Sequence, residues 1–141
     1  MAIFECEPPV SKKVNPFIGV LLFLISIVLL VTTGPLGLIY GLGYKLFTKF
    51  MTGIGDFCLE IAISVDQLGN VLMQHLLNHL WITSKGYKFG NRDETISSVI
   101  GKNLQTDTLT SFGKLMDRIL DFLEPEHSLN SIDYFIQPIE E

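Results

Sequence analysis

Two groups of side chains contain the residue types that protein chemistry uses. His75 and His79 are four residues apart, the spacing at which two imidazoles on one helix face can reach a single metal ion. Residue 76 is leucine, whereas the metalloprotease motif has glutamate beside its first histidine, and no third ligand follows nearby. We therefore interpret both histidines as hydrogen-bonding residues of a polar helix face, and the sequence predicts neither a metal site nor a cofactor.

The second group lies in the polar C-terminal third. It combines acids, hydroxyls, an amine and an imidazole: Asp93, Glu94, Ser97, Ser98, Lys102 and His127. In a hydrolase, Ser97 or Ser98 would be the nucleophile and His127 its base, with Asp93 orienting the histidine. Neither serine has the glycine pattern of a nucleophile elbow. Acids at a helix N-terminus, where the helix dipole favours them, are the simpler interpretation, so we assign no catalytic residue.

The composition of the 141-residue chain indicates a membrane protein. Hydrophobic residues make up 48% and charged residues only 18%, against about 25% charged in typical soluble domains. Mean hydropathy is +0.38. The net charge of −5 lacks the basic footprint that nucleic-acid binding requires, so we expect no nucleic-acid partner.

An apolar segment near the N-terminus predicts a transmembrane anchor. No side chain is charged from Val14 to Tyr44, and the segment 17–31 is almost purely aliphatic and aromatic. About 20 helical residues cross the hydrocarbon core of a bilayer. We expect the helix to begin at Pro16 with Asn15 as its cap and to cross once. Gly34-Pro35 should kink it, so that the span ends near Leu38.

A second helix, from about Phe57 to Ile82, shows a divided surface. Its polar residues recur at helical spacing: Glu60, Ser64, Gln67, Asn70, Gln74 and Asn78. We call this set the polar stripe and interpret it as a candidate interaction face for neighbouring proteins. Leucines, isoleucines and valines occupy the opposite face, so the helix should lie in the membrane interface or pack on protein rather than cross the bilayer.

The C-terminal third predicts two further helices. Asn91 and Glu94 resemble a capping box that would start a helix over residues 92–100, with Gly101 as its C-cap. A third helix should run from about Leu109 to Leu123 and stop before Pro125. No strand pattern and no regular period in the tail from residue 127 are evident.

The segment Gly86–Asn103, with its Asp-Glu-Thr-Ile-Ser-Ser phrase, resembles a family of small membrane-associated proteins encoded by bacteriophages and prophages. The resemblance also takes in Asp66–Asn70 and Glu126–Ser131. It extends over Val65–Ile132 and omits the anchor. It implies a phage-linked origin and carries no established activity.

These observations predict an all-α fold with an N-terminal transmembrane helix, a long amphipathic helix and a small helical C-terminal region. The expected parts are a polar flank (1–15), a transmembrane anchor with a Gly/Pro kink (16–44), an amphipathic membrane-associated helix (45–83) and a polar helical region (84–141). The expected function is structural, in the membrane of a virion or of the bacterial host envelope. The expected partners are the lipid bilayer and either further copies or a neighbouring capsid or membrane protein. A holin-like lysis protein is the first alternative and a membrane-bound hydrolase the second.

Overall fold

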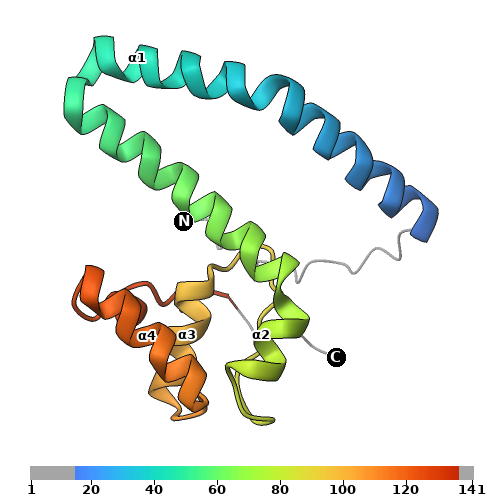
Figure 1. The fold of residues 1–141 in the computed structure, drawn as a ribbon, viewed down its shortest axis with the longest axis vertical. Helices are drawn as coiled ribbons and strands as arrows, with labels where there is room; N and C mark the ends of the chain where they lie inside the picture. The colour runs from blue at the N-terminus through green and yellow to red at the C-terminus, as the bar shows by residue number, and fades with distance from the viewer. Residues whose placement is uncertain (1–14, 137–141) are drawn as a thin grey trace, which may run out of the picture. The chain divides into compact units, whose positions relative to one another are not determined.

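The computed structural model describes residues 15–136, and its regular elements are helices (Figure 1). In chain order they are α1 (Pro16–Leu72), α2 (Gln74–Leu80), α3 (Ile96–Gln105), α4 (Ser111–Leu123) and α5 (His127–Asn130). Within this range the β structure is limited to an isolated antiparallel bridge between Ile82 and Leu109. The predicted all-α fold is confirmed for the described residues. The chain divides into two compact units, unit 1 up to Ile54 and unit 2 from Gly55 onwards.

Unit 1 contains the first and most apolar part of α1. The N–H of Phe17 donates to Oδ1 of Asn15 at 3.0 Å, so Asn15 caps the helix as predicted. None of the most apolar window of α1 is buried, and its leucines, isoleucines and valines are exposed. By length and composition, α1 is able to cross a membrane. Its backbone groups are bonded within the helix, which is what the inside of a bilayer requires.

The departure of α1 from helical geometry does not lie at the predicted Gly34-Pro35 kink. Backbone angles stay helical through Pro35, and the exception inside α1 is Phe50, with φ 51° and ψ −136°. The hydroxyls of Thr32 and Thr33 each bond to a carbonyl one turn earlier at 2.7 Å. Pro35 lacks an N–H donor, and these hydroxyl bonds end on the carbonyls of Val28 and Leu29, not on the Val31 carbonyl four residues before the proline.

The break at Phe50 is accompanied by a close approach of the chain to itself. A positive φ at a residue other than glycine costs of order 1–3 kcal/mol, so the surrounding structure must hold it in place. A Cβ on Gly53 would lie 2.7 Å from Cβ of Lys49 and 3.3 Å from the carbonyl oxygen of Lys45. Only glycine fits there without a shift. The break at Phe50 follows Tyr44, the residue at which the sequence predicted the anchor segment to end.

In unit 2, the predicted helix from Phe57 to Ile82 comprises the last part of α1 and α2. Met73, with φ −99° and ψ 4°, separates the two. The backbone bonds continue across it, because Met73 N–H donates to the Gly69 carbonyl and Leu77 N–H to the Met73 carbonyl, each at 2.9 Å. The interruption is slight, and the helical prediction for this stretch is confirmed.

A small apolar core lies in unit 2. Its buried members are Leu77, Ile82, Phe89, Val99, Ile100 and Leu109. Trp81 packs edge-on against Phe89, with ring centroids 6.0 Å apart. Two backbone bonds flank the bridge that joins the end of α2 to the start of α4: Thr83 N–H to the Thr108 carbonyl at 2.8 Å and Thr110 N–H to the Trp81 carbonyl at 2.9 Å.

The bounds predicted for the helix over residues 92–100 are wrong, because α3 begins later and continues further. Thr95 is its N-cap, and its Oγ1 accepts from Ser98 N–H at 3.1 Å. Gly101, the predicted C-cap, lies inside α3 and is buried. A Cβ on Gly101 would collide with the carbonyl oxygen of Ser128. Glycine is needed there because the backbones of α3 and α5 meet. In the sequence, a glycine needed for close packing looks the same as a glycine that ends a helix.

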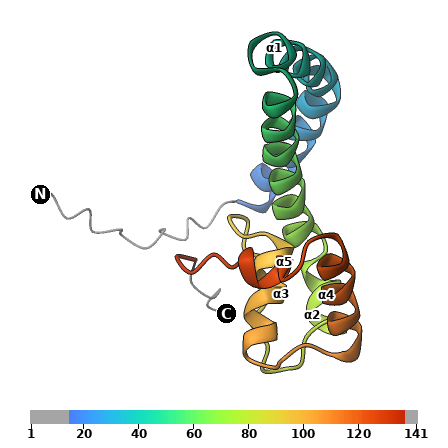
Figure 2. The same cartoon turned by 90° about the vertical axis from the view of Figure 1, so that its left-hand side faces the viewer.

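Helix α4 agrees with its prediction, whereas α5 lies in the tail for which no period was evident. The N-cap of α4 is Thr110, whose Oγ1 accepts from Gly113 N–H at 3.2 Å, and the helix ends at Leu123, before Pro125. Figure 2 shows α5 lying against α3 and α4, in agreement with their residue contacts.

Candidate functional site

Three asparagines, two of them buried and Asn78 partly buried, hold the loop of residues 83–95 against the helices of unit 2. The side chain of Asn78 pairs with Phe89 in both directions, donating to its carbonyl at 3.0 Å and accepting from its N–H at 2.8 Å. Asn103 pairs with Tyr87 in the same way, at 2.8 Å in each direction. A carboxamide has one donor and one acceptor group, like a peptide unit, so each asparagine substitutes for a neighbouring strand.

Asn70 completes this set from the last part of α1. Its Nδ2 donates to the carbonyls of Asn91 and Glu94 at 3.0 and 2.7 Å, and its Oδ1 accepts from Gly90 N–H at 2.9 Å. Its side chain is completely buried. These three asparagines, which we call the asparagine clamps, fix the position of the loop before α3.

The polar stripe therefore has two parts. Gln67 joins the clamps by donating to the Asp93 carbonyl at 3.1 Å, and Gln74 donates to the Val71 carbonyl at 2.9 Å. Ser64 and Glu60, one and two turns before Gln67, are exposed. The C-terminal part of the stripe thus binds the protein's own backbone. Its interaction with other molecules stays a prediction for the two exposed residues.

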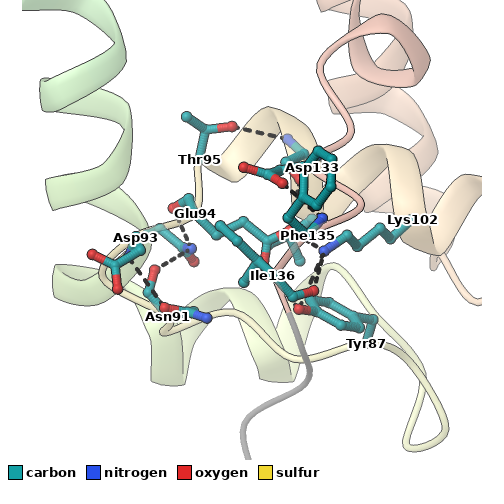
Figure 3. Close-up of polar contacts among 12 residues, drawn as sticks. Tyr87, Asn91, Asp93, Glu94, Thr95, Lys102, Asp133, Phe135 and Ile136 are labelled. Carbon is teal, nitrogen blue, oxygen red and sulfur yellow. Dashed lines mark hydrogen bonds and ion pairs between the residues drawn. The ribbon is translucent and has the colours of Figure 1, made fainter. Parts of the chain in front are cut away.

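A second polar group gathers around the carboxylate of Glu94 (Figure 3). Oε1 of Glu94 lies 2.6 Å from Nζ of Lys102 and accepts from the Ser98 hydroxyl at 2.6 Å. Oε2 accepts from the Tyr87 hydroxyl at 2.9 Å. Lys102 also lies over the Tyr87 ring, 4.4 Å from its centroid. We call Tyr87, Glu94, Ser98 and Lys102 the Glu94 network.

The network also holds the segment that follows α5. Asp133 N–H donates to the Ser98 hydroxyl oxygen at 3.0 Å, and Lys102 Nζ donates to the Ile136 carbonyl at 3.2 Å. Ser98 sits one turn before Lys102 on α3, and Glu94 lies just before the helix, so all three project to the same side. The arrangement joins the loop before α3 to the end of the described chain.

The electrostatics of the network are those of a buried ion pair. The side chain of Glu94 is completely buried and that of Lys102 is 13% exposed. Burial raises the pKa of the Tyr87 phenol above its ordinary value, and its hydrogen bond to Glu94 raises it further because that bond needs the proton. The negative charges of Glu94 and Asp133 act in the same direction.

The geometry of Ser98 does not suit nucleophilic catalysis. Its hydroxyl proton is donated to Glu94, its oxygen accepts from a backbone N–H, and only 1% of the residue is exposed. A substrate would have to displace the segment around Asp133 before it reached the oxygen. The Glu94 network therefore connects separate segments of the fold, and the polar groups of its four side chains already have hydrogen-bond or ion-pair partners.

The other residues of the hydrolase hypothesis have separate partners. Ser97 Oγ donates to Asp66 Oδ2 at 3.1 Å, and His127 Nδ1 lies 2.7 Å from Glu124 Oε2. Asp93 is exposed and faces Arg92 at 3.6 Å. Among the hydrogen bonds of residues 15–136, none connects His127 to either serine. Of the predicted cluster, the structure brings together Glu94, Ser98 and Lys102 only.

Sequence reasoning missed Tyr87 and Asp133 as members of this site. The spacing of Glu94, Ser98 and Lys102, each four residues from the next, was a helical signal for three members. Tyr87 and Asp133 come from irregular segments on either side of α3, and no periodicity points to them. His75 and His79 are exposed, and no group of three metal-binding side chains occurs among the described residues.

The surface of unit 2 differs from that of a typical soluble domain. Asn70, Glu94, Asn103 and Asp117 are buried, whereas Leu72 is 74% exposed and Phe122 88% exposed. In a domain surrounded by water the opposite distribution is usual. Large exposed apolar patches mark surfaces that bind protein or membrane.

No family model, no curated protein and no solved structure matches this chain.

Proposed function

We propose that the protein is a small integral membrane protein with a structural, assembly role. In this proposal α1 anchors the chain in a membrane, and unit 2 packs against neighbouring copies. The observation that carries the proposal is an exposed apolar seam on the outer face of α1 and α2, composed of Val65, Leu68, Leu72 and Leu76.

The seam is unusual because the other side of the same helix is already occupied. The asparagine clamps lie on that other side and bond to the loop of residues 83–95. The leucines of the seam therefore face away from the part of the helix that packs on unit 2. Spacings of three and four residues place the seam members in one narrow row, the pattern of helix-to-helix packing. No lysine or arginine lies between residues 50 and 84, so the basic margin of a lipid-binding helix is missing. A second copy of this helix is the partner that fits.

The resemblance to phage-encoded membrane-associated proteins supplies the setting of the proposal. The protein would belong to the internal membrane of a virion or to the envelope of the bacterial host. Mass spectrometry of purified particles tests this setting. Growth arrest and depolarisation on expression of the protein alone would instead favour a lysis protein.

Cross-linking in membranes tests the assembly role. In a cysteine-free background (Cys6→Ser, Cys58→Ser), Leu72→Cys should give covalent dimers with a short bifunctional maleimide, and Leu68→Cys should behave alike. Thr106→Cys, at an exposed polar position of α3's C-cap, is the matched control and should stay monomeric. If all three variants remained monomeric to the same extent after cross-linking, assembly through the seam would be contradicted.

The anchor is tested separately, on the same membranes. Alkaline carbonate should leave the protein in the membrane pellet, because an apolar span is not released by charge or pH. Release into the supernatant would contradict anchoring by α1.

A further inference from the structure

Helix α4 carries a second exposed apolar surface, distinct from the seam. Its members are Phe112, Leu115, Ile119, Phe122 and Leu123, which we call the α4 face. Their spacings of three and four residues place them on one side of the helix. Phe122 is 88% and Leu123 77% exposed. In a helix surrounded by water these side chains would form the side that packs on the core.

The opposite edge of α4 is the one that packs on unit 2. Gly113 and Asp117 are the buried residues of the helix, and Asp117 is only 6% exposed. A Cβ on Gly113 would collide with the Trp81 carbonyl oxygen, so this edge lies directly on backbone. Met116 and Leu120 pack on the core beside this edge, and rotating the helix to bury Phe122 and Leu123 instead would break both contacts. The fold therefore commits the α4 face to the outside.

The charges beside the α4 face suit a membrane surface. Lys114 and Arg118, one turn apart and both exposed, border the side of the helix on which Leu115 and Phe122 lie, and Lys114 also pairs with the exposed Asp107 at 2.8 Å. Interfacial helices carry lysine and arginine beside their apolar face, because the long stems reach the headgroups while the face enters the acyl boundary. The seam on α1 and α2 lacks this margin.

An aromatic pair marks the start of the same surface. The rings of Trp81 and Phe112 have centroids 6.5 Å apart. Trp81 is partly exposed, and its indole combines an apolar body with one N–H donor. Tryptophan is enriched where a protein meets the headgroup region. The surface thus offers an apolar face, basic neighbours and, at its edge, a partly exposed tryptophan that also packs on the core.

We propose that the α4 face lies in the interfacial region of a lipid bilayer and holds unit 2 against the membrane surface. The inference rests on the proposed anchoring by α1. The chain passes from the anchor into unit 2 within the bounds of α1, a few residues after the break at Phe50. Tethering of this kind raises the effective lipid concentration, so a face of five side chains is sufficient for binding.

Nitroxide accessibility of the full-length protein in phosphatidylcholine vesicles tests the proposal. In the cysteine-free background, a label at Phe122→Cys should collide with oxygen far more often than with a water-soluble nickel chelate. The ratio of the two collision rates should exceed, several-fold, that of a label at Asp121→Cys. Asp121 is the matched control, since it is exposed and lies on the polar side of the same helix. Ile119→Cys provides a second reporter on the α4 face.

A label at Val28→Cys keeps the two proposals distinguishable. If Val28 reports lipid while Phe122 and Asp121 give the same ratio, the membrane contact of α4 is overturned and anchoring stands. If the label at Val28 also collides readily with the nickel chelate, the proposed anchoring by α1 is overturned. If the Phe122 label is shielded from both reagents and shows dipolar broadening that disappears on dilution with unlabelled protein, a second copy covers the face and the lipid proposal is overturned.

Discussion

Units 1 and 2 satisfy their polar side chains over very different sequence distances. In unit 1 the hydroxyls of Ser26, Thr32, Thr33, Thr48 and Thr52 bond to carbonyls three or four residues earlier. In unit 2 Asn78 reaches 11 residues along the chain to Phe89, and Ser98 reaches 35 residues to Asp133. The first unit is satisfied by its own helix, whereas the second depends on segments that only folding brings together.

The same contrast separates the roles of apolar side chains. In unit 1 the apolar residues are exposed, because none of the most apolar window of α1 packs on protein. In unit 2 a few apolar residues form a core, while the seam and the α4 face stay outside. The comparison teaches that unit 2 owes its specific shape largely to buried polar contacts. Substitutions that remove those contacts should therefore have the largest effects.

The largest effect is expected for Lys102→Met. It leaves the fully buried carboxylate of Glu94 without its cation, and breaking a buried pair in this way costs about 3–5 kcal/mol of unfolding free energy. Denaturant unfolding in detergent, followed by Trp81 fluorescence, measures the loss. Lys114→Met is the control, because its pair with Asp107 is exposed and should matter little.

A double variant sharpens the Lys102 prediction. Glu94→Gln combined with Lys102→Met removes both charges, so it should be more stable than Lys102→Met alone. Equal stability of the single and double variants would mean that the pair contributes through packing and not through charge.

A smaller effect is expected for Gly101→Ala. The added methyl group collides with the Ser128 carbonyl and must push α3 and α5 apart, at a cost of about 1–3 kcal/mol. Gly55→Ala is the matched control, since a Cβ at that helical position meets nothing within 4 Å. Alanine there should be neutral or stabilising, because it is the better helix former. A Gly101→Ala protein as stable as Gly55→Ala would show that α5 does not depend on this contact.

The smallest effect concerns pH and Tyr87. Because the folded-state pKa of its phenol is raised, the neutral phenol contributes stability below the unfolded-state pKa of about 10 and loses it as pH rises above that value. Above pH 10 the unfolding free energy should fall more steeply with pH in the wild type than in Tyr87→Phe, with a difference in slope of at most about 1.4 kcal/mol per pH unit. Unfolding curves between pH 9 and 11, on the order of one decade each side of that pKa, measure the slope.

Tyr134→Phe is the control for the alkaline measurement. Tyr134 is exposed, so its removal should leave the wild-type slope in place. If Tyr87→Phe and Tyr134→Phe unfold with the same pH dependence, the phenol of Tyr87 is not held by the Glu94 network as the structure indicates.

The elements of this fold were largely predictable, and their partners were not. Helical periodicity located the helix after Phe57 and most of α4, because amphipathic spacing is a local property of the chain. Gly101 was assigned to a helix end, since a glycine needed for close backbone packing has the same sequence signature as a C-cap. For the candidate site, the predicted cluster of acids, hydroxyls, an amine and an imidazole included Glu94, Ser98 and Lys102, but Tyr87 comes from an irregular loop that no pattern singled out.

The sequence by itself determined the character of α1. An uncharged run longer than a bilayer is thick dictates a helix whose backbone is satisfied internally, wherever the rest of the chain lies. Only the tertiary structure decided which side of each later helix faces inward. Burial of Asn70 and Asp117 with exposure of Leu72 and Phe122 is the reverse of what hydrophobicity suggests. For Asn70 the physical reason is that the loop of residues 83–95 needs carboxamide partners for its backbone. For Asp117 it is that α4 lies on the Trp81 backbone along its Gly113 edge, which carries Asp117 inward with it.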